Sequence, residues 1–355
     1  MPKRAGNLYQ KTQDREFVKA VLIEACRGRH DRRDVRRVYE SLDTKTDTLV
    51  RIFKEHSFKP HAVRKTRRYD TSSQKWRDIK TVPFFPDACI QWVIIYILME
   101  PVFMRGMDHY CCSSIPGRGG ERIKRRLTEY LLHNHKDSKD AGQMDVHHYY
   151  DNISITKLMK KLRRRCKDEE LLQLIELIIR SASEDGEHGL AIGLYICQWL
   201  ANFFLEDIDR KVRESGLVRC YVRYMDNMTA LCGNKRRLHK LRKLIEEELA
   251  ELGLELKGDW QIFRTAKRPI VAVGYRFYGN GCIVFRKRTW LKARRQFMRV
   301  KKKQQEGIAI PLKTARGILS RIGNLKQVKS PRTIRRDYVA GVNINQIRRI
   351  VQVCS

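Results

Sequence analysis

The sequence has no apolar run close to the roughly 18 residues that a membrane-spanning helix needs. Residues 1–10 also lack the apolar stretch of a secretory signal. Its 10 cysteines include no Cys-x-x-Cys pair, so neither a disulfide framework nor a zinc knuckle is predicted. We therefore expect a cytoplasmic protein without a membrane partner.

Acidic residues are scarce relative to basic ones. The 355 residues include 40 Asp and Glu against 74 Lys and Arg, which gives a formal net charge of +34. A field of this strength makes a polyanion the expected partner, and nucleic acid is favoured over an anionic membrane surface. A hydrophobic fraction of 42% is enough for a substantial core, so the chain is not a disordered tail.

The positive charge is concentrated toward the C-terminus. Residues 1–70 form an N-terminal region that is basic and helix-forming, with no catalytic signature. Residues 281–355 hold 20 Lys and Arg against 2 acidic residues, more than half of the net charge of the chain. This change in composition predicts a separate basic C-terminal domain.

Patterns of apolar residues and turn formers predict the elements between these ends. Pro83 and Pro86 forbid a continuous helix, and Asp87 is the expected N-cap of a buried helix over residues 88–103. Further helices are expected over residues 121–133, 154–182, 197–213 and 238–252, and strands before Asp145, over 218–223 and 228–232, and from 271 to 278.

Two aspartates occupy positions where such elements end. Asp145 follows a short strand, and Asp226 lies in the turn of a predicted hairpin. Either one alone is ordinary turn chemistry. Two carboxylates brought together from separate strands, however, form an oxygen-rich site suited to Mg²⁺, and a pair of such ions can catalyse phosphoryl transfer.

Several blocks around these aspartates occur in a fixed order. They include Ser114 to Gly120, Asp145 with Tyr149-Tyr150, Gly189 to Gln198, the box Tyr224-Met225-Asp226-Asn227, and Val273 to Tyr278. Over residues 45–290 the chain resembles reverse transcriptases of the bacterial type, those of group II introns, retrons and, most closely, diversity-generating retroelements and related prophage enzymes.

The resemblance implies an α+β right-hand polymerase fold, with fingers over residues 71–135, a palm of antiparallel sheet and helices over 136–280, and a basic helical thumb over 281–355. It implies RNA-directed DNA polymerisation with two Mg²⁺ ions, for which Mn²⁺ can substitute. The implied partners are an RNA template, a DNA or RNA primer, deoxynucleoside triphosphates and a small basic accessory protein. The implied source is a bacterial or phage-encoded retroelement.

The resemblance also assigns roles to individual residues. Asp145, Asp226 and the carbonyl of Val146 would hold the metal, and Asn227 and Lys257 would join the aspartates as catalytic residues, with Lys257 donating a proton to pyrophosphate. The nucleotide would contact the following residues: Arg77, Tyr150, Gly193 and Gln198. Gly274 and Tyr275 would form the primer grip.

One position in the box departs from the family pattern. Asn227 stands where the family has a second aspartate, which removes a negative charge but keeps an amide oxygen. This leaves an alternative open: a catalytically weakened or inactive RNA-binding protein that keeps the fold. An RNA-synthesising polymerase is disfavoured by Tyr150, because an aromatic ring there would exclude a 2′-hydroxyl.

Overall fold

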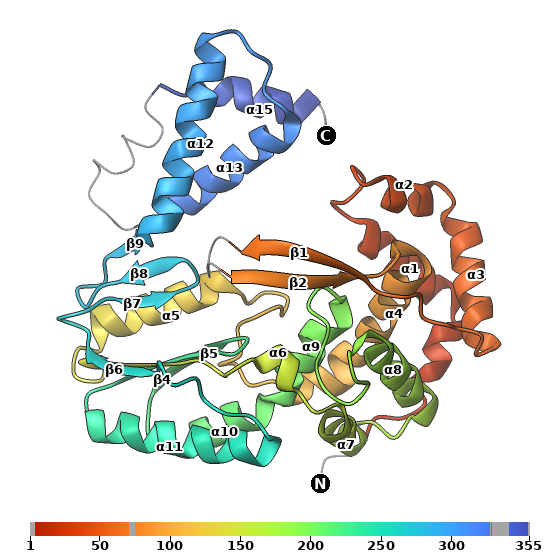
Figure 1. Ribbon diagram of the computed structural model, residues 1–355, viewed down its shortest axis with the longest axis horizontal. Helices are drawn as coiled ribbons and strands as arrows, with labels where there is room; N and C mark the ends of the chain where they lie inside the picture. The colour runs from red at the N-terminus through yellow and green to blue at the C-terminus, as the bar shows by residue number, and fades with distance from the viewer. Residues whose placement is uncertain (1–3, 71–74, 327, 329–340, 354–355) are drawn as a thin grey trace. The chain divides into compact units, whose positions relative to one another are not determined.

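The structure, a computed structural model, describes residues 4–70, 75–326, 328 and 341–353 (Figure 1). The chain forms two compact units, each assembled from segments that are distant in the sequence. Unit one consists of Met1–Gly119, Met144–Met228 and His239–Trp260. Unit two consists of Gly120–Gln143, Thr229–Leu238 and Gln261–Ser355.

The N-terminal part of unit one is largely helical, as the sequence predicts, but residues 64–70 form the strand β1 (Arg64–Asp70), so the prediction of a helical region up to residue 70 is wrong there. Its helices are α1 (Arg15–Cys26), α2 (Arg33–Glu40), α3 (Leu42–Lys54) and α4 (Cys89–Leu98). Asp14 begins α1 by accepting hydrogen bonds from the backbone N–H groups of Glu16 and Phe17 at 3.0 and 3.1 Å. The α1 helix packs on α3 and α4 (Figure 1), and Val18 and Leu49 are fully buried in the core that results.

Asp87 does not cap the apolar helix, so this prediction is wrong. The segment η2 (Phe84–Ala88), in which Phe85 is extended, already precedes α4, and its helical part includes Asp87. The carboxylate is buried and instead accepts from the backbone N–H of His61 at 2.9 Å and contacts the ring Nδ1 of His61 at 2.7 Å. A second helical turn, η3 (Met99–Met104), follows α4. The described part of the chain contains no helix that is long and apolar enough to cross a membrane.

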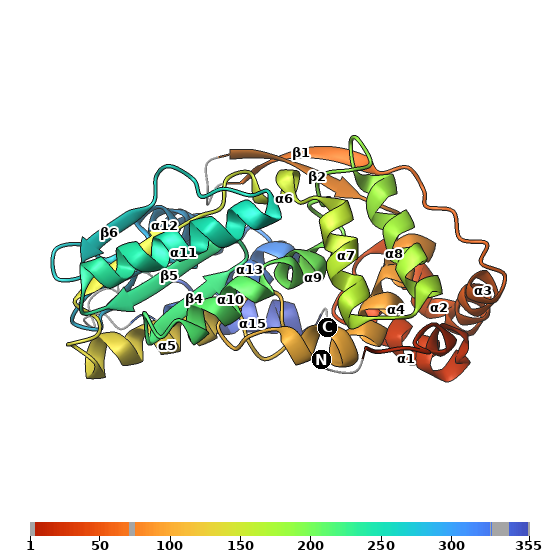
Figure 2. The same cartoon turned by 90° about the horizontal axis from the view of Figure 1, so that it is seen from below.

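Two long helices expected from the sequence are each divided in two. Residues 154–182 form α7 (Ile155–Arg165) and α8 (Glu169–Ala182), which lie side by side (Figure 2). The break occurs because Asp168 caps α8 through the N–H of Leu171 and also accepts from the N–H groups of Leu8 and Tyr9. Residues 197–213 likewise form α9 (Tyr195–Phe204) and α10 (Glu206–Glu214).

The strands form three sheets, and the strand pairs with an assigned register are antiparallel. The nine strands of the described residues are β1 (Arg64–Asp70), β2 (Lys75–Thr81), β3 (Asp140–Met144), β4 (Cys220–Tyr224), β5 (Asn227–Cys232), β6 (Gln261–Arg264), β7 (Ile270–Ala272), β8 (Tyr275–Phe277) and β9 (Ile283–Phe285). Strands β1 and β2 form a hairpin, the largest sheet has the order β4-β5-β3-β6, and the third has the order β7-β8-β9. This mixture of helices and antiparallel sheets confirms the α+β class.

Two of the remaining helices, Gly120–His133 and Lys235–Leu252, agree with the helices expected from the sequence, but one predicted strand does not form as expected. The helices are α5 (Gly120–His133), α6 (Tyr149–Asn152), α11 (Lys235–Leu252), α12 (Lys287–Gln305), α13 (Leu312–Lys326) and α15 (Ile344–Val353). The strand expected from 271 to 278 is the β7-β8 hairpin, because Val273 and Gly274 turn the chain with φ of 43° and 85°. A β-branched residue rarely adopts a positive φ, so the local sequence did not indicate this turn.

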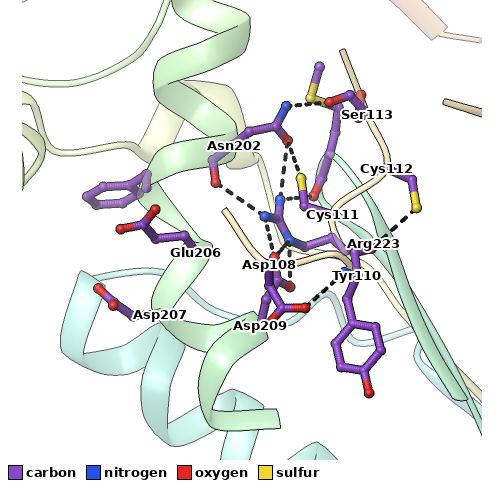
Figure 3. Close-up of polar contacts among 12 residues, drawn as sticks. Asp108, Tyr110, Cys111, Cys112, Ser113, Asn202, Glu206, Asp207, Asp209 and Arg223 are labelled. Atoms are coloured by element: carbon purple, nitrogen blue, oxygen red, sulfur yellow. Dashed lines mark hydrogen bonds and ion pairs between the residues drawn. The ribbon is translucent and has the colours of Figure 1, made fainter. Parts of the chain in front are cut away.

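A buried ion pair connects β4 to α10 within unit one (Figure 3). The side chains of Arg223 and Asp209 are both fully buried, and their closest contact is 2.6 Å. The guanidinium donates from Nε and Nη2 to the carboxylate, which also accepts from the Tyr221 hydroxyl at 3.2 Å. Each charge is therefore compensated inside the core.

We expect Asp209→Asn to lower the free energy of unfolding by about 3 to 5 kcal/mol, because it leaves the Arg223 charge buried without a counter-charge. Urea denaturation of the full chain measures the change. Lys243→Gln is the matched control, since Lys243 and Glu247 form an exposed pair at 3.9 Å, and it should change stability by less than about 0.5 kcal/mol. Equal effects of the two substitutions would contradict this account of the core.

Candidate active site

Asp145 and Asp226, predicted from the sequence to converge, interact directly in unit one. Asp145 follows β3, and Asp226 lies in the turn between β4 and β5. Burial, the charge of Asp226 and a hydrogen bond to its carboxyl group together raise the pKa of Asp145 to about 6, although the positive charge of Lys257 opposes the shift. The three side chains therefore share one electrostatic environment.

One carboxylate oxygen of Asp145 lacks a hydrogen-bond donor. Its Oδ1 is buried and has no hydrogen-bond partner among the described residues. A buried oxygen without a donor carries a desolvation penalty, which a proton or a cation would remove. The described residues contain no group of three or more His, Cys, Asp or Glu side chains that could hold a metal, so any cation here would depend on these two carboxylates and backbone oxygen.

Backbone hydrogen bonds fix the position of Asp145. Val146 pairs with Leu256 in an isolated antiparallel bridge. The bridge uses the carbonyls of Asp145 and Glu255, which accept from Lys257 and His147 at 2.8 and 2.9 Å. It therefore leaves the carbonyl of Val146, the predicted third metal ligand, unused by the bridge. The roles assigned to these residues stay predictions.

Lys257 contributes its backbone as well as its side chain. Its N–H donates to the Asp145 carbonyl, while its ammonium group pairs with the carboxylate of Asp259. This hydrogen bond raises the pKa of Lys257 and keeps the side chain protonated at neutral pH. The predicted proton donor is thus charged and close to Asp145.

Arg223, which the sequence analysis missed, holds the turn that carries Asp226. Its Nη1 donates to the carbonyl of Met225 at 2.9 Å, and its Nη2 donates to the backbone carbonyl of Asn202 at 3.2 Å (Figure 3). Met225 has a positive φ of 55°, a conformation that a side chain disfavours without such support. An arginine at an inward position of a strand signals a buried partner, but the sequence does not reveal which acid provides it.

Asn227, at the departure from the family pattern, is exposed and begins β5. Its side-chain amide Nδ2 donates to Oδ1 of Asp226 at 3.1 Å. The residue therefore acts here as a hydrogen-bond donor to Asp226. A second carboxylate at this position would instead add a negative charge.

Tyr150 lies beside the same turn. Its hydroxyl donates to Sδ of Met225 at 3.5 Å, and the ring is partly buried. Burial and the charge of Asp226 raise the pKa of Tyr150, and the positive charge of Arg77 on β2 opposes the shift, so Tyr150 interacts electrostatically with both Asp226 and Arg77. The neighbouring Tyr149 is buried and donates to the Ala201 carbonyl, so it anchors this segment to α9.

Gly193 and Gln198 occupy the segment that leads into α9. A Cβ on Gly193 would lie 2.3 Å from the Lys80 carbonyl oxygen, and the Ile192 carbonyl accepts from the Lys80 N–H at 2.8 Å. Only glycine permits this approach to β2, so Gly193 has a packing role whatever else it does. Gln198 Oε1 accepts from the Ser114 hydroxyl in the glycine-rich loop at 3.3 Å.

Gly274 and Tyr275, the predicted primer grip, belong to unit two. Gly274 lies in the turn of the β7-β8 hairpin with a φ of 85°. Tyr275 is buried, its ring stacks on Phe285 with centroids 5.1 Å apart, and the ammonium of Lys124 lies 4.8 Å from its centroid. Their contact with a primer stays a prediction.

Comparison with solved structures finds weak similarity to yeast telomerases. One is apo telomerase from Candida tropicalis truncated from the C-terminal domain, with a TM-score of 0.46, 11% identity, and coverage of 66% of this chain and 58% of that chain. Another is telomerase from Candida albicans in complex with a fragment of telomeric RNA, with a TM-score of 0.49, 11% identity, and coverage of 84% and 61%. The chain thus spans about three fifths of each.

Comparison of sequences is more informative. No curated protein matches this sequence. The profile of the family described as "Reverse transcriptase (RNA-dependent DNA polymerase)" matches residues 66–276. The match covers more than half of the chain and includes both Asp145 and Asp226. The α+β fold is accordingly that of a reverse transcriptase, and the chain belongs to the reverse transcriptase family.

Proposed function

We propose that this protein is an active RNA-directed DNA polymerase that adds deoxynucleotides to a primer 3′-hydroxyl. The observation that carries the proposal is the convergence of Asp145 and Asp226 from separate segments onto one site, where one buried oxygen has no hydrogen-bond partner among the described residues. Family membership supports the reaction class. The Mg²⁺ requirement and the activity itself are parts of the proposal.

The residues present fit a magnesium site. Asp145 and Asp226 offer carboxylate oxygens, and the Val146 carbonyl is unused by its bridge. Mg²⁺ prefers oxygen ligands and keeps several waters, so two carboxylates and a carbonyl are a suitable donor set. When bound, such ions activate the primer hydroxyl and stabilise the pyrophosphate leaving group.

The chain's own residues would bind and orient the nucleotide. Arg68 and Arg77 are direct cross-strand partners in the β1-β2 hairpin. Guanidinium groups can donate paired hydrogen bonds to phosphate oxygens, so we propose that this face of the hairpin binds the triphosphate. Tyr150, beside the Asp226 turn, supports selection of deoxynucleotides because its ring would exclude a 2′-hydroxyl.

The block from Gly189 to Gln198 supports a finer assignment. Its pattern Ile192-Gly193, followed by Cys197-Gln198, resembles that of diversity-generating retroelements, in which a serine precedes the glutamine. We therefore propose a retroelement or prophage enzyme that works with a small basic accessory protein.

Asn227 favours a second candidate, an RNA-binding protein that keeps the fold without the chemistry. The substitution removes one carboxylate of the box, and a lower negative charge weakens the attraction for Mg²⁺. Both candidates predict RNA binding, and only polymerase activity separates them.

We expect Asp145→Asn to raise the free energy of unfolding by about 1 to 2 kcal/mol at neutral pH in the absence of divalent cations, since the amide removes a partly exposed, repelled charge. Because the folded state raises the pKa of Asp145 from 3.8 to about 6, the destabilisation is absent at low pH, grows as the pH rises through this interval and is complete above it. Urea denaturation at several pH values measures the difference.

Mg²⁺ should stabilise the wild type but not Asp145→Asn. Millimolar Mg²⁺ is expected to raise the melting temperature of the wild type and to leave that of Asp145→Asn unchanged, because binding to the folded state stabilises it. Na⁺ at matched ionic strength is the control for screening. A wild type that gains no stability from Mg²⁺ or Mn²⁺ beyond this control would contradict the proposed metal site.

Primer extension on an RNA template tests the activity. We expect wild-type extension with deoxynucleotides and Mg²⁺, and a loss of at least about a hundredfold in Asp226→Asn, because that change removes a charge that stabilises the transition state. Asn227→Asp should extend faster than the wild type if the missing carboxylate limits metal binding. Tight RNA binding without any product in the wild type and in Asn227→Asp would support the RNA-binding candidate instead.

A further inference from the structure

The β1-β2 hairpin of unit one has two chemically different faces. Its strands are paired without a bulge from Arg64 opposite Thr81 to Asp70 opposite Lys75. Directly opposed residues share a face, and residues two apart along a strand share it too. Arg68, Arg77 and Ile79 therefore lie on one face, whereas Arg67, Tyr69 and Trp76 lie on the other.

The first face is directed toward the candidate active site. The side chain of Ile79 would lie 2.8 Å from a Cβ on Gly193, and Arg77 acts electrostatically on Tyr150. The proposed polymerase activity therefore gives this face a role, in binding the nucleotide. It gives no role to the opposite face.

That opposite face, the aromatic face, exposes large rings. Tyr69 and Trp76 are 47% and 58% exposed, and Trp76 is the most exposed large hydrophobic side chain among the described residues. Their rings pack edge to face with centroids 5.3 Å apart, and the guanidinium of Arg67 lies 5.5 Å from the Trp76 centroid. About half of each side chain is thus open to solvent.

The charges around the aromatic face favour an anionic ligand. On this face the strands carry three basic residues, Lys65, Arg67 and Lys80, and a single acidic residue, Asp78, which is the direct cross-strand partner of Arg67. At the far end, Lys65 and Lys80 both contact Glu184, at 2.7 and 2.6 Å. Arg67 is therefore the basic residue beside the rings, and the chain as a whole carries a net charge of +34, so a ligand that is anionic and has aromatic surface would suit both.

We propose that the aromatic face binds single-stranded RNA, with an unpaired base stacked on Trp76 and Tyr69 and the adjacent phosphates near Arg67. Unpaired bases stack on exposed aromatic rings and on arginine, and basic side chains follow the backbone. A duplex keeps its bases stacked internally and offers no free face. The inference deepens the proposed function and rests on it, since it gives the template strand a contact on the hairpin.

Binding of a fluorescein-labelled oligouridine of about 12 nucleotides, followed by anisotropy without divalent cations, tests the inference. We expect Trp76→Val to weaken binding by about 5- to 100-fold, Tyr69→Val to weaken it less, and Trp76→Phe to restore most of the affinity. Valine is chosen because it suits a strand and keeps the hairpin. Oligouridine should also quench wild-type tryptophan fluorescence, and Trp76→Phe should lose that quenching while still binding.

Tyr39→Ala is the matched control, because Tyr39 is 48% exposed on α2, away from the hairpin. It should bind oligouridine like the wild type. A blunt RNA duplex is the second control, and its binding should change less than twofold in Trp76→Val. Unchanged oligouridine binding by Trp76→Val, or equal losses for oligouridine and duplex, would overturn the inference, as would equal losses in Tyr39→Ala.

The outcome is separable from that of the polymerase proposal. Asp226→Asn should bind oligouridine with wild-type affinity, since it leaves the aromatic face intact. If the wild type extends no primer but Trp76→Val still loses oligouridine binding, the polymerase proposal fails and the aromatic face stands as an RNA-binding surface. If extension is normal and Trp76→Val binds normally, the aromatic face is not an RNA site and the polymerase proposal stands.

Discussion

Repulsion between Asp145 and Asp226 is the constraint on which the site depends. Burial of Asp145 and, after it, the negative charge of Asp226 raise the pKa of Asp145, so holding the two carboxylates together destabilises the chain. The rest of the fold has to hold them together. Asp145 is fixed by the bridge between Val146 and Leu256, and the turn bearing Asp226 is fixed by Arg223. Backbone hydrogen bonds on one side and a buried guanidinium on the other supply the rigidity that a preorganised ion site needs.

The buried Arg223 and Asp209 pair is better understood as a positioning device than as a source of stability. Burying two charges costs about as much as their attraction returns, and apolar residues of similar volume often stabilise a core equally well. Apolar residues could not, however, donate to the carbonyl of Met225 while also reaching Asn202. The pair therefore connects the turn to α9 and α10 through directional bonds. This directional role is specific to arginine, whose planar group donates along several fixed directions.

Local patterns predicted much of this arrangement, and long-range contacts account for the rest. The strand before Asp145, the hairpin around Asp226 and the α5 helix follow from periodicity and turn residues that act within a few positions. The partner of Arg223 could not be predicted, because many acids in the sequence are equally suitable. Asp168 and Asp87 show the same limit: each carboxylate is engaged by segments remote in sequence, which divides one predicted helix and removes a predicted cap. At Val273 tertiary packing overrides the local preference of a β-branched residue.

The repulsion between Asp145 and Asp226 also explains in physical terms why an asparagine at position 227 is tolerated. The amide donates to Asp226, so it supports the carboxylate without adding a third negative charge to a site where Asp145 already resists ionisation. The cost is a weaker electrostatic attraction for Mg²⁺, and the benefit is a more stable cation-free protein. A chain selected only to bind RNA would gain stability by neutralising Asp145 or Asp226 as well, since neither is needed to contact phosphate. The chain keeps aspartate at both positions, with a buried oxygen of Asp145 that has no hydrogen-bond partner among the described residues, which agrees with the proposal that a cation binds there.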